Sequence, residues 1–220
     1  MHDNLLPRTL TLFCHPIYFL LILMALRNVD WKKILNESQT QHVFLGACVF
    51  IMMLWSMRAG ITPGLNLHFL GTTVLTLVLG WPLAILASAL ALLADTFFGY
   101  GSWDEFSFNG LFLAAIPILT IHTIYRLVDR YLPQHIMIYI LVTAFFGTLL
   151  TMFLRTTLFA LAITLSSTYT FDLLSYEYLP YMLVLAFPEA LLNGMLVTVL
   201  VLWRPEWVST FDDRKYLLNK

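Results

Sequence analysis

Long apolar runs separated by short polar segments dominate this sequence. A membrane-spanning helix needs about 20 predominantly apolar residues, and several runs approach or exceed that length. The runs cover residues 9–26, 42–57, 68–98, 108–127, 136–165 and 179–203. Only 11% of the residues are charged, against about 25% in soluble domains. The sequence therefore predicts an all-α fold, a polytopic membrane helical bundle that forms a single domain over residues 1–220.

The run at residues 68–98 is too long for one ordinary span and too short for two full ones. At about 1.5 Å per residue, residues 68–80 cover only about 18 Å. We therefore predict a break at Gly80-Trp81-Pro82, with Pro82 in the first turn of the second half, where its missing N–H costs nothing. This division gives about seven transmembrane helices, of which spans 3 and 4 are short. Residues 58–67 are predicted to form a Gly/Pro turn region.

Basic residues are unevenly distributed among the polar segments. Seven spans place the two termini on opposite sides, and short loops rich in Lys and Arg stay in the cytoplasm. One side holds nine basic residues: Arg27, Lys32, Lys33, Arg126, Arg130, Arg204, Arg214, Lys215 and Lys220. The other side holds Arg8 and Arg58. The asymmetry predicts an N-terminus outside and a cytoplasmic tail at residues 204–220.

Met1, His2 and His68 supply nitrogen atoms on the predicted outer side. The Met1 amine, the His2 amide nitrogen and the His2 imidazole can form a planar three-nitrogen chelate. The His68 imidazole completes a square-planar set, a geometry that suits Ni(II) or Cu(II). Two simpler interpretations remain open. His2 is an accidental residue of a frayed terminus, or His68 caps the helix that it is predicted to begin.

Three ionisable residues lie inside apolar runs, where charges are costly and are functional candidates by default. Asp95 lies near the outer end of span 4 and is predicted to orient His68; capping a helix, or pairing with Arg58 or Arg155, is the alternative. Arg155 and Glu189 are predicted to form an ion pair inside the bundle, which would limit the cost of both charges. A proton or ion relay is the alternative for this pair.

Several function classes find no support in the sequence. No Walker-type glycine-lysine loop occurs, so nucleotide binding through that motif is not expected. The net charge of −1 gives no electrostatic case for nucleic acid. An intramembrane hydrolase is weakly supported, because Cys14 and His15 are adjacent and adjacent helical side chains point apart. The chain is therefore not predicted to be an enzyme.

The central stretch resembles the CbiM/NikM family, the cobalt/nickel substrate-binding membrane components of energy-coupling-factor transporters. The resemblance rests on residues 44–50 (FLGACVF), 61–64 (ITPG) with His68 and Gly71, 79–82 (LGWP), 108–126, 187–194 (FPEALLNG) and 204–206 (RPE). It covers most of the chain and is strongest over residues 44–126.

The resemblance implies a bacterial inner-membrane subunit that captures a divalent transition metal (nickel, cobalt or copper) from the outer side. Met1, His2 and His68 stand where the family places its metal ligands, and Asp95 and Asn109 would orient them or act as a gate. The implied partners are membrane lipid, a transmembrane coupling subunit and separate ATPase subunits.

A second hypothesis is a membrane chaperone or assembly factor that keeps the fold without transporting metal. Two departures from the family pattern motivate it. Residues 64–67 (GLNL) replace a loop of small residues, and Phe112 replaces an asparagine.

Overall fold

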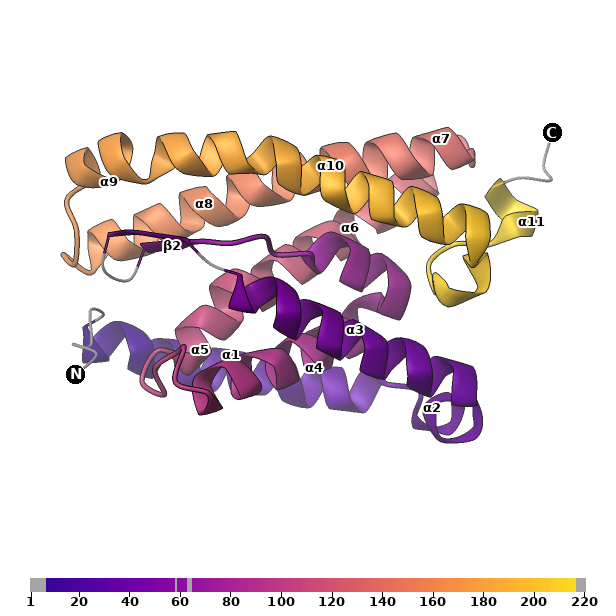
Figure 1. Ribbon diagram of the computed structural model, residues 1–220, viewed down its shortest axis with the longest axis horizontal. Coiled ribbons are helices and arrows are strands. Elements are labelled where there is room, and N and C mark those ends of the chain that lie inside the picture. The colour runs from indigo at the N-terminus through magenta and orange to yellow at the C-terminus, as the bar shows by residue number, and fades with distance from the viewer. Residues whose placement is uncertain (1–6, 58, 63–64, 217–220) are drawn as a thin grey trace.

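The computed structural model describes residues 7–57, 59–62 and 65–216, which form a bundle of long helices (Figure 1). Within these residues, five helices are long and apolar enough to cross a membrane. They are Leu10–Asn28, Thr72–Phe97, Phe106–Tyr131, Ile136–Leu165 and Leu179–Trp203. The helical class of the fold is thus confirmed, whereas the count of seven spans is not. The prediction of seven counted α3 (Ser38–Ser56), which begins with four polar residues, and divided α4 (Thr72–Phe97) in two.

The predicted bounds of the last two spans are confirmed. Residues 136–165 form one continuous run and residues 179–203 form α10 (Leu179–Trp203). The remaining helical elements are α1 (Arg8–Asn28), α2 (Trp31–Asn36), α5 (Phe106–Asn109), the π-helix η1 (Gly110–Ala115), α6 (Ile116–Tyr131), α7 (Ile136–Ile138), the π-helix η2 (Tyr139–Phe146), α8 (Gly147–Leu165), α9 (Phe171–Glu177), the 3₁₀ turn η3 (Pro205–Trp207) and α11 (Asp213–Tyr216). Both π-helices lie inside long apolar runs, where an extra residue per turn changes which backbone groups bond to each other.

Helix α4 breaks at Gly80, as the sequence predicted. Gly80 has φ 76° and ψ 161°, outside the helical region, and Pro82 follows at the start of the second segment. We call residues 72–79 the short arm and residues 81–97 the long arm. The short arm runs toward the α11 end of the molecule and the long arm returns toward α5 (Figure 1). The two predicted short spans are therefore the two arms of one folded-back element.

The segment that connects α3 to α4 is extended, not helical. Two short antiparallel strands, β1 (Ala59–Thr62) and β2 (Leu65–Leu67), come first, so the all-α prediction missed a small hairpin. Residues 68–71 then have no regular structure, and the helix begins at Thr72. The prediction that His68 begins a helix is wrong. Gly71 has φ 63°, outside the right-handed helical region, and the Leu70 and Gly71 amides bond to Glu189 of α10 instead of to helical carbonyls.

The C-terminal segment folds back onto the bundle. Val208, Phe211 and Tyr216 are buried in the main core. The ring of Tyr139 lies 5.2 Å from the ring of Phe211, and Phe211 stacks on Tyr216 at 5.1 Å between centroids. The prediction of a polar tail is therefore incomplete, because three apolar side chains among its charged residues anchor it.

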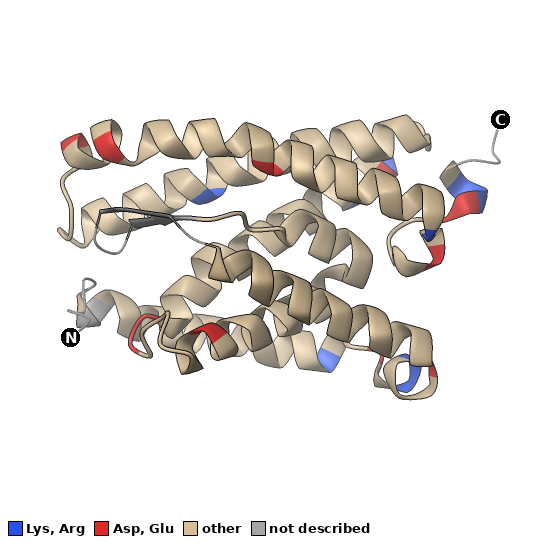
Figure 2. Cartoon of the chain, viewed as in Figure 1, with Lys and Arg blue, Asp and Glu red and all other residues tan. Residues whose placement is uncertain are grey.

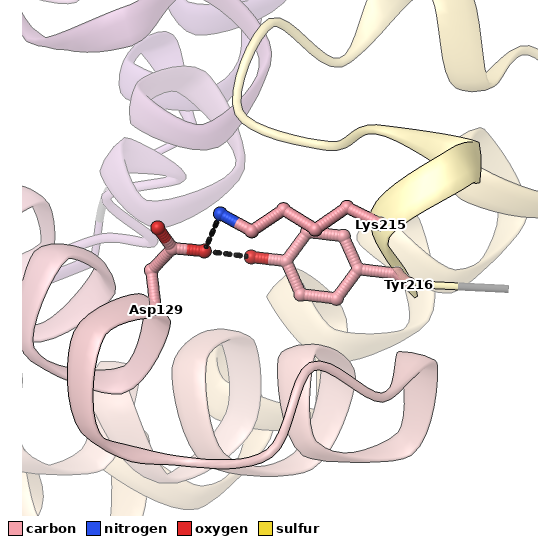
Figure 3. A network of polar contacts seen from close by, with 3 residues as sticks. All are labelled: Asp129, Lys215 and Tyr216. Atoms are coloured by element: carbon pink, nitrogen blue, oxygen red, sulfur yellow. Dashed lines mark hydrogen bonds and ion pairs between the residues drawn. The ribbon is translucent and has the colours of Figure 1, made fainter. Parts of the chain in front are cut away.

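Polar contacts hold the same segment to α6. The carboxylate of Asp129 pairs with the Lys215 ammonium and accepts a 2.7 Å hydrogen bond from the Tyr216 hydroxyl (Figure 3). Burial and this hydrogen bond to a carboxylate raise the pKa of Tyr216 above its ordinary value. The hydroxyl therefore stays protonated at neutral pH and can donate to Asp129.

Basic residues are concentrated at one end of the bundle. Figure 2 shows most Lys and Arg at the end that carries α2 and α11, whereas Asp and Glu lie at both ends. The predicted orientation, with the α2 and α11 end in the cytoplasm, agrees with this distribution and stays a prediction.

Candidate functional site

Glu189 binds the extended segment at two backbone amides. Its side chain lies near the middle of α10 and is 1% exposed. One carboxylate oxygen accepts from the Leu70 N–H at 2.9 Å and the other from the Gly71 N–H at 2.8 Å. These amides lie just before the first turn of the short arm, where no intrahelical acceptor exists. The carboxylate therefore supplies the missing acceptors, and its negative charge faces the positive end of the helix dipole.

Asn193, one turn further along α10, completes this clamp. Its side-chain carbonyl accepts from the Val74 N–H at 2.9 Å, and its amide group donates to the Glu189 carboxylate at 2.8 Å. Glu189 and Asn193 together cap the short arm from a neighbouring helix. A helix that starts inside an apolar bundle needs such partners, because no water is at hand to satisfy its first amides.

His68 lies two residues before the first clamped amide. The Trp55 indole N–H donates to the Leu70 carbonyl at 3.0 Å, and the Trp55 ring lies 6.2 Å from the His68 ring. His68 is half-buried, and its Nδ1 lies 3.2 Å from the Phe69 carbonyl oxygen. A carbonyl only accepts, so Nδ1 is the donor in this contact, and in the neutral tautomer with that proton the lone pair is on Nε2. This tautomer is the one that suits metal coordination through Nε2.

The other predicted ligands and their neighbours have different outcomes. Met1 and His2 lie outside the described residues. Asp95 is half-buried near the end of the long arm, where its backbone carbonyl accepts from the Tyr100 N–H at 3.0 Å. Asn109 is the half-buried last residue of α5. The structure thus places Asp95 and Asn109 at the two sides of the α4–α5 loop, and their role as orienting or gating residues stays a prediction.

The predicted ion pair between Arg155 and Glu189 does not form. Arg155 is 3% exposed and donates from Nε to the Phe112 carbonyl at 3.2 Å, with Nη1 3.6 Å from the Met182 sulfur. The ion pairs between described residues join Lys215 to Asp129 and Arg204 to Glu206. The prediction is wrong because each of the two buried charges bonds to backbone groups instead of to the other charge.

The carbonyl that Arg155 binds lacks a helical partner. In η1 the Ile116 N–H donates to Leu111, five residues back, so the next donor in this pattern would serve Phe112. That next residue is Pro117, which has no N–H. Arg155 supplies the missing donor from α8. Sequence reasoning missed this role, although two features of the sequence indicate it. Pro117 removes a helical N–H from one apolar run, and Arg155 places a donor in another.

A comparison with known families gives a match over nearly the whole chain. The family described as "Cobalt uptake substrate-specific transmembrane region" (CbiM) matches residues 1–207.

The chain belongs to the CbiM family.

A solved structure described as a truncated transition metal transporter has the same fold. The TM-score is 0.76 at 18% identity, over 91% of this chain and 98% of that one. No curated protein matches. The family match confirms the resemblance seen in the sequence, and it identifies this CbiM-family protein as a multi-pass membrane component of metal uptake, not an enzyme. His68, Asp95, Asn109, Arg155 and Glu189 all fall within the matched residues.

Proposed function

We propose that this chain is the substrate-binding membrane component of a cobalt or nickel uptake system. The Met1 amine, the His2 amide nitrogen, the His2 imidazole and His68 Nε2 would bind the divalent ion. A set of four nitrogen ligands in one plane favours Ni(II) and Cu(II). The family description, which names cobalt uptake, supports the class of substrate.

The observation that carries the proposal is the clamped, non-helical segment that holds His68. Irregular backbone inside a membrane bundle is tolerated where it is buried in protein or lines a cavity. Here a buried carboxylate, a side-chain amide and an indole fix that backbone at Leu70, Gly71 and Val74. This arrangement orders the backbone beside the His68 imidazole, the side-chain type that most often binds metal ions in proteins.

The proposal includes an orientation and partners. The N-terminus would lie outside and the α2 and α11 end in the cytoplasm of a bacterial inner membrane, so the ion is captured from the outer side. Separate ATPase subunits and a transmembrane coupling subunit would energise transport. The distribution of Lys and Arg between the two ends of the bundle supports this orientation.

The ligand set is tested by calorimetric titration of Co²⁺ and Ni²⁺ into the full chain in lipid nanodiscs. We expect His68→Ala to abolish binding, and His42→Ala, which alters an exposed histidine of α3, to leave it unchanged. Extending the N-terminus by one residue should also abolish binding, because it displaces the terminal amine. Normal affinity in the extended form would exclude the proposed chelate.

A membrane chaperone or assembly factor is the alternative function. The observation that favours it is Phe112, whose ring packs 4.5 Å from Phe108 and 5.8 Å from Phe159 in a buried aromatic cluster. A wild-type chain that binds no cobalt, nickel or copper after loading at neutral pH would support this alternative.

A further inference from the structure

Both ends of the short arm are bonded by α10 and the segment that follows it. Glu189 and Asn193 hold the start of the arm, beside the His68 segment. At the other end, the Ser209 N–H donates to the Val78 carbonyl at 2.9 Å. Thr210 donates twice to the Leu77 carbonyl, from its N–H at 3.2 Å and from its hydroxyl at 2.7 Å. The short arm is thus held between the candidate site and the C-terminal segment.

The bonds at the Val78 end of the short arm replace a helical hydrogen bond that the sequence rules out. The helical donor for the Val78 carbonyl would be the N–H four residues on, and that residue is Pro82. Gly80 also leaves the helical conformation between them. The carbonyls at the end of the arm therefore need donors from elsewhere, and the C-terminal segment supplies them.

Residues 209–216 are themselves held at several points. The Tyr139 hydroxyl and the Thr210 hydroxyl lie 2.7 Å apart. Further along, Lys215 and Tyr216 bond to Asp129 (Figure 3). Thr210 is central to this arrangement, because its hydroxyl links η2 to the short arm. Loss of that hydroxyl removes two contacts at once and leaves the backbone unchanged.

We propose that residues 209–216 position His68 through the short arm, with Thr210 as the principal positioning residue. The short arm is a single helix of eight residues, about 12 Å long, so a displacement of one end is passed to the other. When the Leu77 and Val78 carbonyls lose their donors, the short arm is free to shift. The backbone amides that Glu189 binds then shift with it. A partner that draws residues 209–216 away would therefore weaken metal binding. By reciprocity, bound metal would tighten the attachment of this segment. The metal part of this inference rests on the proposed function.

The test combines metal titration with amide hydrogen exchange on the full chain in nanodiscs. The variant is Thr210→Val, and Thr210→Ser restores the hydroxyl. Thr157→Val is the matched control, because Thr157 is exposed and its hydroxyl bonds only within α8, to Phe153 at 2.8 Å. In the metal-free chain, we expect Thr210→Val to speed exchange at Ser209, at Leu70 and at Gly71. The serine variant and the control should match the wild type.

The inference also predicts how much the Co²⁺ affinity changes. We expect Thr210→Val to weaken Co²⁺ binding about tenfold, within the roughly 5–150-fold range of typical couplings between sites. In the wild type, Co²⁺ should slow exchange at Ser209 and Thr210.

Two results would overturn the inference. One is faster exchange at Ser209 with unchanged exchange at Leu70 and Gly71 and unchanged Co²⁺ affinity. The other is unchanged exchange at Ser209 itself. If Thr210→Val does not fold, Tyr139→Phe removes the other hydroxyl of the same contact and carries the test. A wild type that binds no Co²⁺ contradicts the proposed function, and the metal-free exchange comparison still decides whether residues 209–216 position Leu70 and Gly71.

Discussion

Two buried charges of opposite sign serve two different places in the bundle. Glu189 binds the N–H groups of Leu70 and Gly71 at the start of a helix. Arg155 binds the Phe112 carbonyl inside a π-turn. In each place a backbone group has no hydrogen-bond partner within its own helix. The sign of the buried charge suits the peptide group that needs a partner. A carboxylate accepts from free N–H groups and a guanidinium donates to a free carbonyl.

The two places differ in what lies beside them. The Glu189 site adjoins the segment that carries His68, whereas Arg155 lies among Phe112, Phe159 and Met182. The comparison teaches that a buried charge in a membrane bundle is not by itself a sign of substrate binding. We expect Glu189 to affect both stability and metal affinity, and Arg155 to affect stability alone.

The largest expected effect comes from Glu189→Leu. The change leaves two buried amides without acceptors, at a cost of about 1–3 kcal/mol each, and it releases the His68 segment. We expect the free energy of unfolding, measured by detergent titration in mixed micelles, to fall accordingly, and Co²⁺ binding to be lost. Glu177→Gln, on the exposed face of α9, is the control and should change neither. Wild-type Co²⁺ affinity in Glu189→Leu would contradict the claim that Glu189, unlike Arg155, affects metal binding.

Arg155→Met should have a smaller and different effect. It leaves one carbonyl unpaired, which costs about 1–3 kcal/mol of unfolding free energy. Co²⁺ affinity should stay within about twofold, because Arg155 contacts Phe112, Met182 and Phe159 and not the His68 segment. Pro117→Ala returns an N–H that can serve the Phe112 carbonyl. The double variant should therefore lose less than the sum of the two single losses, by about 0.5–3 kcal/mol. Strict additivity would contradict the account of the π-turn.

Gly71→Ala tests the Glu189 site without changing a charged residue. A side chain at φ 63° costs roughly 1–2 kcal/mol, and its Cβ would lie 2.7 Å from Leu54 Cδ2. We expect lower stability and weaker Co²⁺ binding in the same titrations. Gly99→Ala, at φ 82° with no atom within 4 Å of the added carbon, isolates the conformational cost. Equal Co²⁺ affinities in the two variants would show that the position of Gly71 does not matter to the site.

Tyr216→Phe should have the smallest effect, about 1 kcal/mol of unfolding free energy at pH 7. The folded state raises the pKa of Tyr216, so it holds the proton more tightly than the unfolded chain. This contribution is complete below the ordinary tyrosine pKa of about 10 and is lost as the pH rises above it. The difference between wild type and Tyr216→Phe, followed by thermal unfolding from pH 7 to 11, should therefore shrink above about pH 10. A difference that grows with pH would contradict this sign.

Features that depend on neighbouring residues could be predicted from the sequence. The lengths of the apolar runs gave the bounds of α10 and of residues 136–165. The Gly80-Trp81-Pro82 break also follows from local rules, because glycine permits the positive φ and proline suits a first turn.

Features that depend on distant residues could not be predicted. Gly71 and Glu189 are 118 positions apart in sequence, so nothing near His68 shows that its segment stays extended. Opposite charges in two apolar runs suggested that Arg155 and Glu189 pair. The backbone groups that bind them instead appear only once η1 and the arm of α4 are formed. The docking of residues 209–216 was missed for the same reason, although Val208 and Phe211 are the apolar residues among the polar and charged ones at 208–215.

The fold-back of α4 has a consequence for how the chain is inserted. By length and composition, α4 is one apolar stretch of 26 residues, and a straight helix of that length would make a single crossing. Every later helix would then cross the lipid in the opposite direction, and the C-terminus would lie on the other side of the membrane. Because α4 turns back at Gly80, it returns the chain to the side on which the hairpin lies (Figure 1). The turn at Gly80 and Pro82 thus sets the side of the membrane from which each later helix starts.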